Sequence, residues 1–180
     1  MNNIRTFEGM TPVIAEDAWV DEAAVVIGNV EIGSGSSIWP STVIRGDIHR
    51  IRIGERTSIQ DGTVVHVTHD SQFVPGGFPT IVGNDITVGH NVTLHGCEIK
   101  DKCLVGMGSI VLDGAVVEPQ VIIGAGSLVP GGKVLESGYL YVGSPVKQIR
   151  KLTEKELAFF EYSAQNYQKL GQRHLKAEAT

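Results

Sequence analysis

The sequence predicts an all-β fold, a parallel β-helix of about six triangular coils, followed by one C-terminal α-helix. Three observations predict the β-helix: a six-residue period of aliphatic residues, 22 glycines for tight turns, and an aromatic content of only 6%. The last of these leaves a core of small aliphatic side chains. We expect a single domain over residues 1–180, because this length suffices for one sizeable core and is short for two.

The six-residue period defines the β-helix over residues 10–135. A shift of three residues follows Ile44 and a longer insertion follows Val65. Each hexad predicts one short strand and one turn with its aliphatic residue inward, and three hexads close one coil. The eighteen inward positions are Ile14, Val20, Val26, Ile32, Ile38, Ile44, Ile53, Ile59, Val65, Val82, Val88, Leu94, Ile99, Val105, Val111, Val117, Ile123 and Val129.

Two further elements follow along the chain. The insertion after Val65 contains Pro and paired glycines, which predicts a loop extruded from one coil near 68–79. Thr153 and Glu156 form a capping-box pattern, and apolar residues recur after them at helical spacing, which predicts an amphipathic helix over 153–170. Gly171 is expected to interrupt this helix, and 171–180 to form a frayed tail.

Charge and cysteine content exclude several classes of protein. The formal net charge of −5 argues against nucleic acid or an anionic membrane as partner, and no apolar run is long enough to span a bilayer. Two cysteines, Cys97 and Cys103, without a CxxC spacing indicate buried, inert thiols in a reducing compartment, so we expect a cytoplasmic protein.

The repeat places the polar residues in columns, because residues three hexads apart lie one coil above each other. Arg45, His66 and His95 each follow an inward residue directly and share one edge. A second edge carries Gln60, Asp61 and His90. In a threefold trimer, the first edge of one subunit can face the second edge of its neighbour. His66, His90 and His95 would then meet with a fourth position open, which is the arrangement of a catalytic zinc.

The motifs at these positions resemble the gamma-class carbonic anhydrases, especially their bacterial YrdA-type branch, within the hexapeptide-repeat superfamily. The segments that carry the resemblance are "VIRGD", "IQDG", "VVHVTH", "VGHNVTLHGC" and "VGMGSIVLDGA". The resemblance runs from about residue 10 to the C-terminal helix. It implies a left-handed β-helix, a homotrimer, and reversible hydration of CO2 to bicarbonate by a metal-bound hydroxide.

The resemblance also implies roles for individual residues. His66, His90 and His95 match the metal ligands, and Gln60 matches the residue that hydrogen-bonds the metal-bound water or hydroxide. Arg45 and Asp61 match an ion pair across the subunit interface, with Asp47 as a further partner of Arg45. Zn2+ is the expected cofactor, while three imidazoles and a water also suit Fe2+ or Co2+.

One region departs from the family pattern. The loop that carries acidic proton shuttles in the best-studied gamma enzymes here reads "THDSQFVPGGFPT" and lacks glutamate. His69 has a suitable intrinsic pKa for a shuttle, and Asp70 lies beside it. We therefore expect slow or condition-dependent CO2 hydration. Tyr162, Asn166 and Tyr167 on the C-terminal helix are weaker candidates for the site.

Other interpretations remain open at this stage. The three histidines could be structural turn residues on a polar interface, and His49 is more typical of a surface or interface residue than of a ligand. The scaffold alone would suit an acyltransferase that uses coenzyme A. A metal-holding or siderophore-binding module without turnover is the third class. Metal content separates the acyltransferase from the other two, and an activity assay separates those two from each other.

Overall fold

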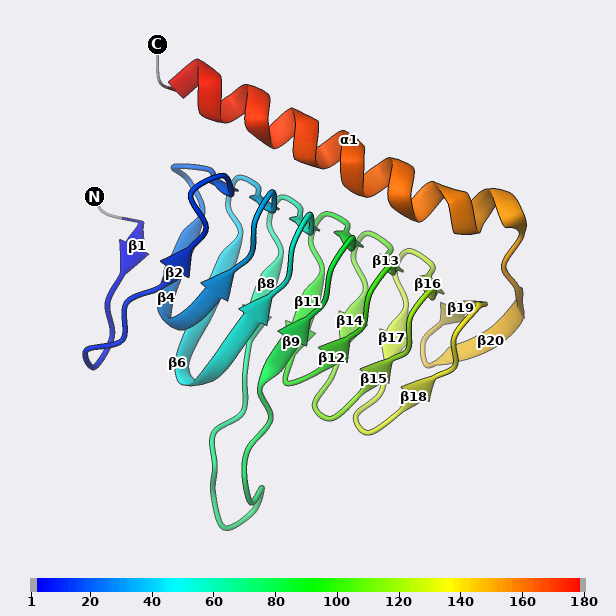
Figure 1. The fold of residues 1–180 in the computed structure, drawn as a ribbon. Helices are drawn as coiled ribbons and strands as arrows, with labels where there is room; N and C mark the ends of the chain where they lie inside the picture. Colours follow the sequence, from blue (N-terminus) through cyan, green and yellow to red (C-terminus); the bar gives the residue numbers. More distant parts are fainter. Residues whose placement is uncertain (1–2, 179–180) are drawn as a thin grey trace.

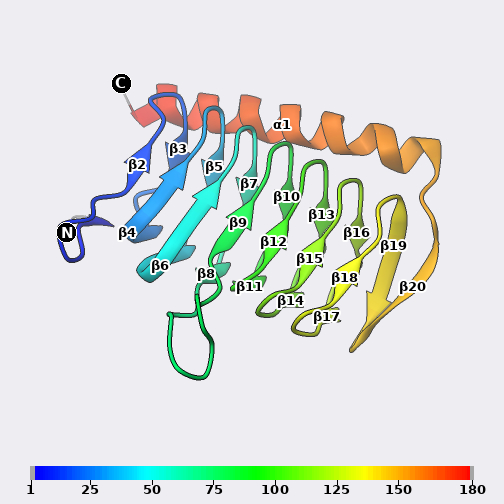
Figure 2. The same cartoon turned by 60° about the horizontal axis from the view of Figure 1, so that its bottom comes forward.

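Short parallel strands stack into three ladders, which together form a β-solenoid of about eight turns within residues 3–178. These are the residues that the computed structural model describes. Helix α1 (Glu154–Glu178) runs along one side of the solenoid, as Figures 1 and 2 show. The fold class predicted from the six-residue period is confirmed.

The helix-side ladder is the one that α1 covers. It consists of β3 (Trp19–Val20), β5 (Ser37–Ile38), β7 (Ser58–Ile59), β10 (Thr87–Val88), β13 (Leu104–Val105), β16 (Ile122–Ile123) and β19 (Tyr139–Gly143). β20 (Val146–Lys151) pairs antiparallel with β19, after a cis Ser144–Pro145 peptide bond.

The other two ladders share the long strands β4 (Val25–Ile32) and β6 (Val43–Ile53), which turn a corner of the triangle. The histidine ladder contains their first halves with β1 (Ile4–Arg5), β8 (Val64–His66), β11 (Thr93–His95), β14 (Ile110–Val111) and β17 (Leu128–Val129). The third ladder contains their second halves with β2 (Val13–Ile14), β9 (Thr80–Val82), β12 (Glu98–Ile99), β15 (Val116–Val117) and β18 (Val134–Leu135).

The aliphatic hexad residues form the core. Of the eighteen predicted inward positions, only Ile14 and Val20 are partly rather than fully buried. Small hydroxyl residues at the corners tie neighbouring coils together, since Thr42 Oγ1 donates to the Gln60 carbonyl at 3.0 Å and Thr63 Oγ1 to that of Gly89 at 3.0 Å. The inward assignment is therefore confirmed.

The predicted number of about six coils is too small. Parallel pairing begins at β1, ahead of residue 10, and continues past residue 135 to β19. The six-residue series extends through Leu135 and Tyr141, which are 0% and 3% exposed. A count that stops at Val129 omits these coils, although Leu135 continues the aliphatic series and only Tyr141 departs from it.

The insertion near 68–79 is an extruded loop, as predicted. It leaves the solenoid between β8 and β9 and protrudes on the side away from α1 (Figures 1 and 2). At its base the backbones of Thr68 and Phe78 exchange two hydrogen bonds of 3.0 and 2.9 Å. The ladder therefore continues from β8 to β11 as if the insertion were absent.

The C-terminal helix begins with the predicted capping box. Thr153 N donates to Glu156 Oε2 at 2.8 Å, and Glu156 N donates back to Thr153 Oγ1 at 3.3 Å. The expected interruption at Gly171 is wrong. At Gly171 the helix lies tightly against the solenoid, because a Cβ there would lie 3.3 Å from that of Ser37.

The expected frayed tail at 171–180 is wrong as far as residue 178, and residues 179–180 lie outside the described residues. The ring of His174 stacks on that of Trp19 with centroids 4.4 Å apart and an interplanar angle of 24°. This contact anchors the last turns of the helix on β3. None of the helices within residues 3–178 combines the length and apolar composition needed to cross a membrane.

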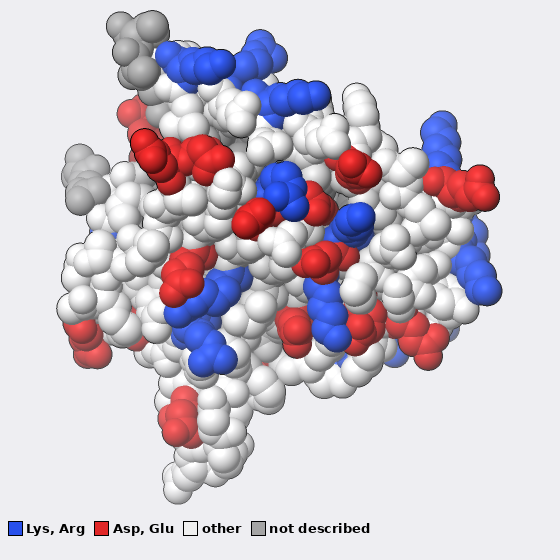
Figure 3. All heavy atoms as spheres, in the orientation of Figure 1, with Lys and Arg blue, Asp and Glu red and all other residues white. Residues whose placement is uncertain are grey.

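Basic and acidic side chains are interspersed on the surface. On the face shown in Figure 3, Lys and Arg lie beside Asp and Glu across the whole solenoid. The ion pairs of the chain include Arg56 with Asp85 at 2.7 Å.

Candidate functional site

Two histidines meet on the outer face of the histidine ladder. His66 ends β8 and His95 ends β11, and the parallel register pairs them directly. Each follows a fully buried inward residue, so its side chain must point outward. His66 Nδ1 and His95 Nε2 lie 3.2 Å apart. The column predicted from the hexad spacing therefore brings two imidazole nitrogens together.

The outer ring nitrogen of each histidine contacts a carboxylate. His66 Nε2 lies 3.1 Å from Asp47 Oδ1, and His95 Nδ1 lies 2.5 Å from Asp113 Oδ1. Carboxylates in this position fix the tautomer and orientation of an imidazole and leave its other nitrogen free to bind a metal. The nitrogens that remain, His66 Nδ1 and His95 Nε2, are the two that lie 3.2 Å apart.

Asp113 is a site residue that the hexad pattern did not predict. It lies two residues after the inward Val111, in the coil next to His95, and reaches back over Gly96. A side chain at position 96 would collide with the Asp113 carboxylate, so the glycine keeps this path open. Extending the histidine column by one coil reaches Leu112, one residue short of Asp113, so the hexad spacing alone does not reveal it.

The third histidine stands on another edge, at the end of β10. His90 Nδ1 lies 2.9 Å from Asp61 Oδ2. This contact follows from the pairing of Val88 with Ile59, which places His90 above Asp61 as the second predicted column requires. Both side chains are nearly half exposed, at 46% and 45%. His90 thus has the same imidazole–carboxylate pairing as the other two, at a surface corner.

Arg45 and burial set the charge state beside His66. Arg45 Nη1 donates to Asp47 Oδ2 at 2.6 Å. Burial acts to raise the pKa of Asp47, but hydrogen bonds from Arg45 and His66 outweigh it and the pKa is lowered. Burial also lowers the pKa of His66, against the opposite effect of its bond to Asp47. A neutral imidazole beside an ionised carboxylate is the state that binds a metal.

The donor set of His66 and His95 fits a tetrahedral metal ion. Two nitrogens at about 2.0–2.1 Å from one Zn2+ lie roughly 3.3–3.4 Å apart in tetrahedral geometry. The observed separation of 3.2 Å is close to this value. Within one copy of the chain, no group of three or more His, Cys, Asp or Glu side chains among residues 3–178 converges on a single point.

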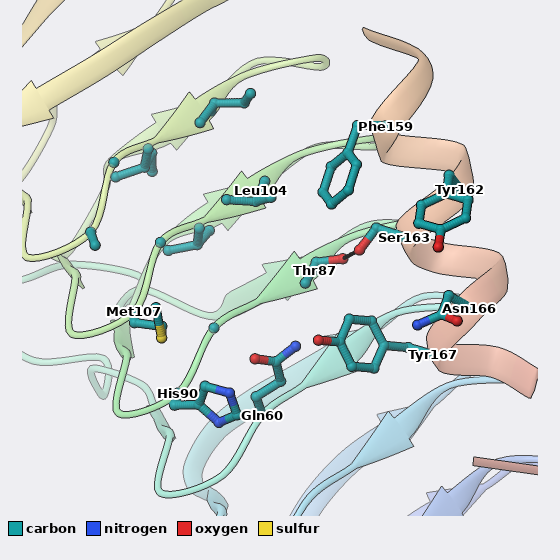
Figure 4. A pocket seen from close by; sticks show the side chains of 17 residues that line it. Gln60, Thr87, His90, Leu104, Met107, Phe159, Tyr162, Ser163, Asn166 and Tyr167 are labelled. Atoms are coloured by element: carbon teal, nitrogen blue, oxygen red, sulfur yellow. Dashed lines mark hydrogen bonds between the residues drawn. The ribbon is translucent and has the colours of Figure 1, made fainter. Parts of the chain in front are cut away.

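A cavity of about 470 Å³ adjoins His90, between α1 and the helix-side ladder. Gln60 and His90 line one end of it, and Tyr162, Asn166 and Tyr167 line it from the helix (Figure 4). The structure thus places the three weaker candidates from the helix at one cavity with Gln60. The Gln60 side chain is only 4% exposed.

The loop histidine lies elsewhere. His69 and Asp70 line a separate polar hollow together with Asp47 and His49. His49 Nε2 contacts the Gly76 carbonyl at 3.2 Å, so His49 supports the loop from below. This hollow reaches the carboxylate behind His66 rather than the converging imidazole nitrogens.

The two cysteines are buried and free, as expected. Burial raises the pKa of both Cys97 and Cys103 to about 12, which keeps them as unreactive thiols at neutral pH.

Comparisons with known proteins place the chain beside two named activities. Residues 11–46 match the family model described as bacterial transferase hexapeptide (six repeats). The chain is 55% identical over 172 residues to Protein YrdA from Escherichia coli, covering 96% of this chain and 94% of that one. It is 42% identical over 169 residues to a carbonic anhydrase from Geobacillus kaustophilus, covering 94% and 89%.

A solved structure gives the same fold under another name. A hexapeptide transferase family protein from Anaplasma phagocytophilum superposes with a TM-score of 0.87 at 40% identity, covering 94% of this chain and 96% of that one.

Proposed function

This chain belongs to the hexapeptide-repeat family that contains YrdA and the gamma-type carbonic anhydrases, and from this membership we propose that it is a metal-dependent carbonic anhydrase of low activity. Its reaction is the reversible hydration of CO2 to bicarbonate. The observation that carries the proposal is the pair of imidazole nitrogens 3.2 Å apart, each oriented by a carboxylate on the far side of its ring.

The proposed metal site lies between two copies of the chain in a homotrimer. One copy supplies His66 and His95, and the neighbouring copy supplies His90. Support comes from His90, which has its own orienting carboxylate on an exposed corner. In a closed threefold ring every interface is identical, so a trimer has three such sites.

Zn2+ bound there would lower the pKa of a bound water to near 7 and so supply hydroxide for addition to CO2. Fe2+ or Co2+ would fit the same nitrogen set. Asp47, Asp61 and Asp113 hold the three imidazoles in the tautomer that a metal needs. Arg45 keeps Asp47 ionised.

Other residues act on the substrate and on the interface. The neutral Gln60 amide, at the cavity end beside His90, is placed to orient a water or CO2 molecule by hydrogen bonding. Arg45 and Asp61 are 43% and 45% exposed, so each can also reach a neighbouring copy and pair across the interface. The two free, buried cysteines support a cytoplasmic location.

The test is stopped-flow CO2 hydration by protein loaded anaerobically with zinc or with iron, beside His95→Ala prepared in the same way. The expected result is turnover in at least one metal form and its loss in the variant. Metal-loaded wild-type protein that hydrates no CO2 would overturn the proposal.

An acyltransferase that uses coenzyme A is the second candidate, favoured by the transferase name of the Anaplasma protein at 40% identity. Such an enzyme would transfer an acetyl group from acetyl-coenzyme A without a stoichiometric metal. A non-catalytic metal- or siderophore-binding protein would retain the metal and turn over neither substrate. Metal content per chain, measured with the hydration assay, separates all three.

A further inference from the structure

The cavity beneath α1 is far larger than CO2 requires. Its volume of about 470 Å³ lies in the range typical of sites for drug-sized organic ligands, whereas CO2 has three heavy atoms. We propose that this cavity binds the acyl group of a second substrate class, carboxylic esters with a short aliphatic or aromatic acyl chain. This inference rests on the proposed metal site at the His90 end of the cavity.

Hydrocarbon side chains form most of the cavity wall. Leu104 of β13 and Ile122 of β16 are successive outward-facing residues of the helix-side ladder, directly paired in register. Phe159 of α1 lies opposite Leu104 (Figure 4), and Met107 borders the same space. Leu104 and Ile122 are partly buried, and the apolar surface they retain lines the cavity under α1.

A loosely docked helix does not explain this space. Toward its C-terminal end α1 is so close to the solenoid that a Cβ at position 171 would lie 3.3 Å from that of Ser37. At the border of the cavity, Thr87 Oγ1 and Ser163 Oγ form a hydrogen bond of 2.7 Å between ladder and helix. The helix is therefore held against the solenoid at Ser163 and at Gly171, and the cavity over β13 and β16 is part of the fold.

The polar end of the cavity suits a carbonyl group. The Gln60 side chain is only 4% exposed. Its amide makes no hydrogen bond to another side chain or backbone group within residues 3–178. In Figure 4 the amide points into the cavity between His90 and the Tyr167 hydroxyl. No fully buried side-chain nitrogen or oxygen within residues 3–178 lacks a partner, so the Gln60 amide is open to the cavity, where a ligand carbonyl oxygen would accept its N–H.

The combination of these two ends defines the substrate. An ester carbonyl at Gln60 would lie beside His90, and its acyl chain would extend over Leu104 and Ile122 beneath Phe159. In the hydrolysis, the oxygen of water forms the new bond to the carbonyl carbon and the bond to the alcohol oxygen breaks. The departing alkoxide takes up a proton, so the products are an acid and an alcohol and no further reactant is needed.

Binding is tested first, on metal-free protein, so that the result does not depend on the metal. Protein labelled at its Leu and Ile methyl groups is titrated with methyl acetate, methyl butanoate and methyl hexanoate and followed by NMR. We expect shifts at Leu104 and Ile122, and a Kd that falls about fourfold for each CH2 group added. Shifts elsewhere, or a Kd independent of chain length, would overturn the proposal.

Two variants and a matched control locate the binding. Leu104→Trp fills the floor of the cavity and should remove the dependence of the ester Kd on acyl chain length. The Kd of this variant is measured from the NMR shifts of the Ile122 methyl groups. Val134→Trp makes the same kind of change at an outward, 56% exposed position on the third ladder and should retain it. Phe159→Ala, at a 44% exposed position, tests the roof without disturbing the core and should weaken methyl hexanoate binding severalfold.

Turnover is tested with zinc-loaded protein and 4-nitrophenyl esters from acetate to hexanoate, in parallel with CO2 hydration. The expected result is hydrolysis whose kcat/KM rises with acyl length. Protein that hydrates CO2 but shows no length-dependent hydrolysis would overturn the ester assignment alone. Length-dependent binding in protein that hydrolyses no ester and hydrates no CO2 would overturn the proposed function and leave an acyl-binding cavity.

Discussion

A mixing experiment decides whether the metal site is built by two chains. His90→Ala chains retain His66 and His95, and His95→Ala chains retain His90. Neither variant alone can form a complete three-histidine site under either a one-chain or a two-chain arrangement. Mixed trimers, however, can form complete sites at those interfaces where the first kind of chain meets the second in the correct order.

The expected magnitude follows from the geometry. In a random equimolar mixture, an interface has the correct chain on each side with a probability of about one half, so about one quarter of the sites are complete. If one chain supplied all three ligands, no site would be complete. Zinc per chain, measured after dialysis against a chelator that strips incomplete sites, gives this fraction relative to wild type.

A second mixture serves as the control. Wild-type chains are mixed with chains that carry both substitutions. The two-chain arrangement again gives about one quarter of wild-type zinc, whereas the one-chain arrangement gives about one half. Native mass spectrometry verifies that the chains assemble at random; one of the two single variants is labelled with 15N for this purpose, because their masses are otherwise equal. Near-zero zinc in the first mixture together with one half in the second would refute the two-chain site.

Three further predictions concern single residues. Asp113→Asn removes the carboxylate that orients the His95 imidazole and should lower zinc affinity about 10–100-fold, measured by competition with a chelator. Gly171→Leu places a side chain against Ser37 and should lower the free energy of unfolding by roughly 1–3 kcal/mol in urea titrations. The Arg150 hydrogen bond lowers the pKa of Glu156 from 4.5 to about 2, so the stability this pair gives is present above pH 4.5 and is lost as the pH falls toward 2. Glu156→Gln should abolish that part of the acid dependence of helix melting, followed by circular dichroism.

Each of these predictions has its own control. Asp101→Asn changes a carboxylate that binds the backbone of Asn84, away from the histidines, and should leave zinc affinity unchanged. Gly171→Ala, whose added Cβ would lie 3.3 Å from that of Ser37, should cost less than Gly171→Leu and separates the effect of losing the glycine from the clash of the longer side chain. Acid melting curves of Glu154→Gln should match those of wild type. A zinc affinity unaltered by Asp113→Asn would contradict its proposed role.

The repeat made the solenoid and both histidine columns predictable, because stacking one coil on the next is determined by the spacing of inward residues alone. His66 and His95 are 29 residues apart, yet their pairing follows from Val65 and Leu94 once the loop is excluded. Asp113 escaped prediction because its side chain crosses from the next coil over Gly96, a path that strand spacing does not reveal.

The C-terminal helix shows the opposite limit of sequence reasoning. A glycine inside a helical pattern ordinarily weakens the helix, which predicted an end at Gly171. The tertiary contact overrides that propensity, since the glycine lets the helix approach Ser37 and brings His174 onto Trp19. The cavity over β13 and β16 was equally hidden, because it depends on how far the helix stands from the ladder at each coil.

The register of the histidine ladder links the core to the proposed chemistry. Val65 and Leu94 are both 0% exposed, and the histidine after each of them is thereby forced outward. A slip of one residue in either strand would bury an imidazole and expose an aliphatic side chain, which the hydrophobic core opposes strongly. The nitrogen separation that suits a metal ion is therefore maintained by inward residues that never touch it. The extruded loop can vary without disturbing that separation, because its two ends close on each other at Thr68 and Phe78 before the ladder resumes.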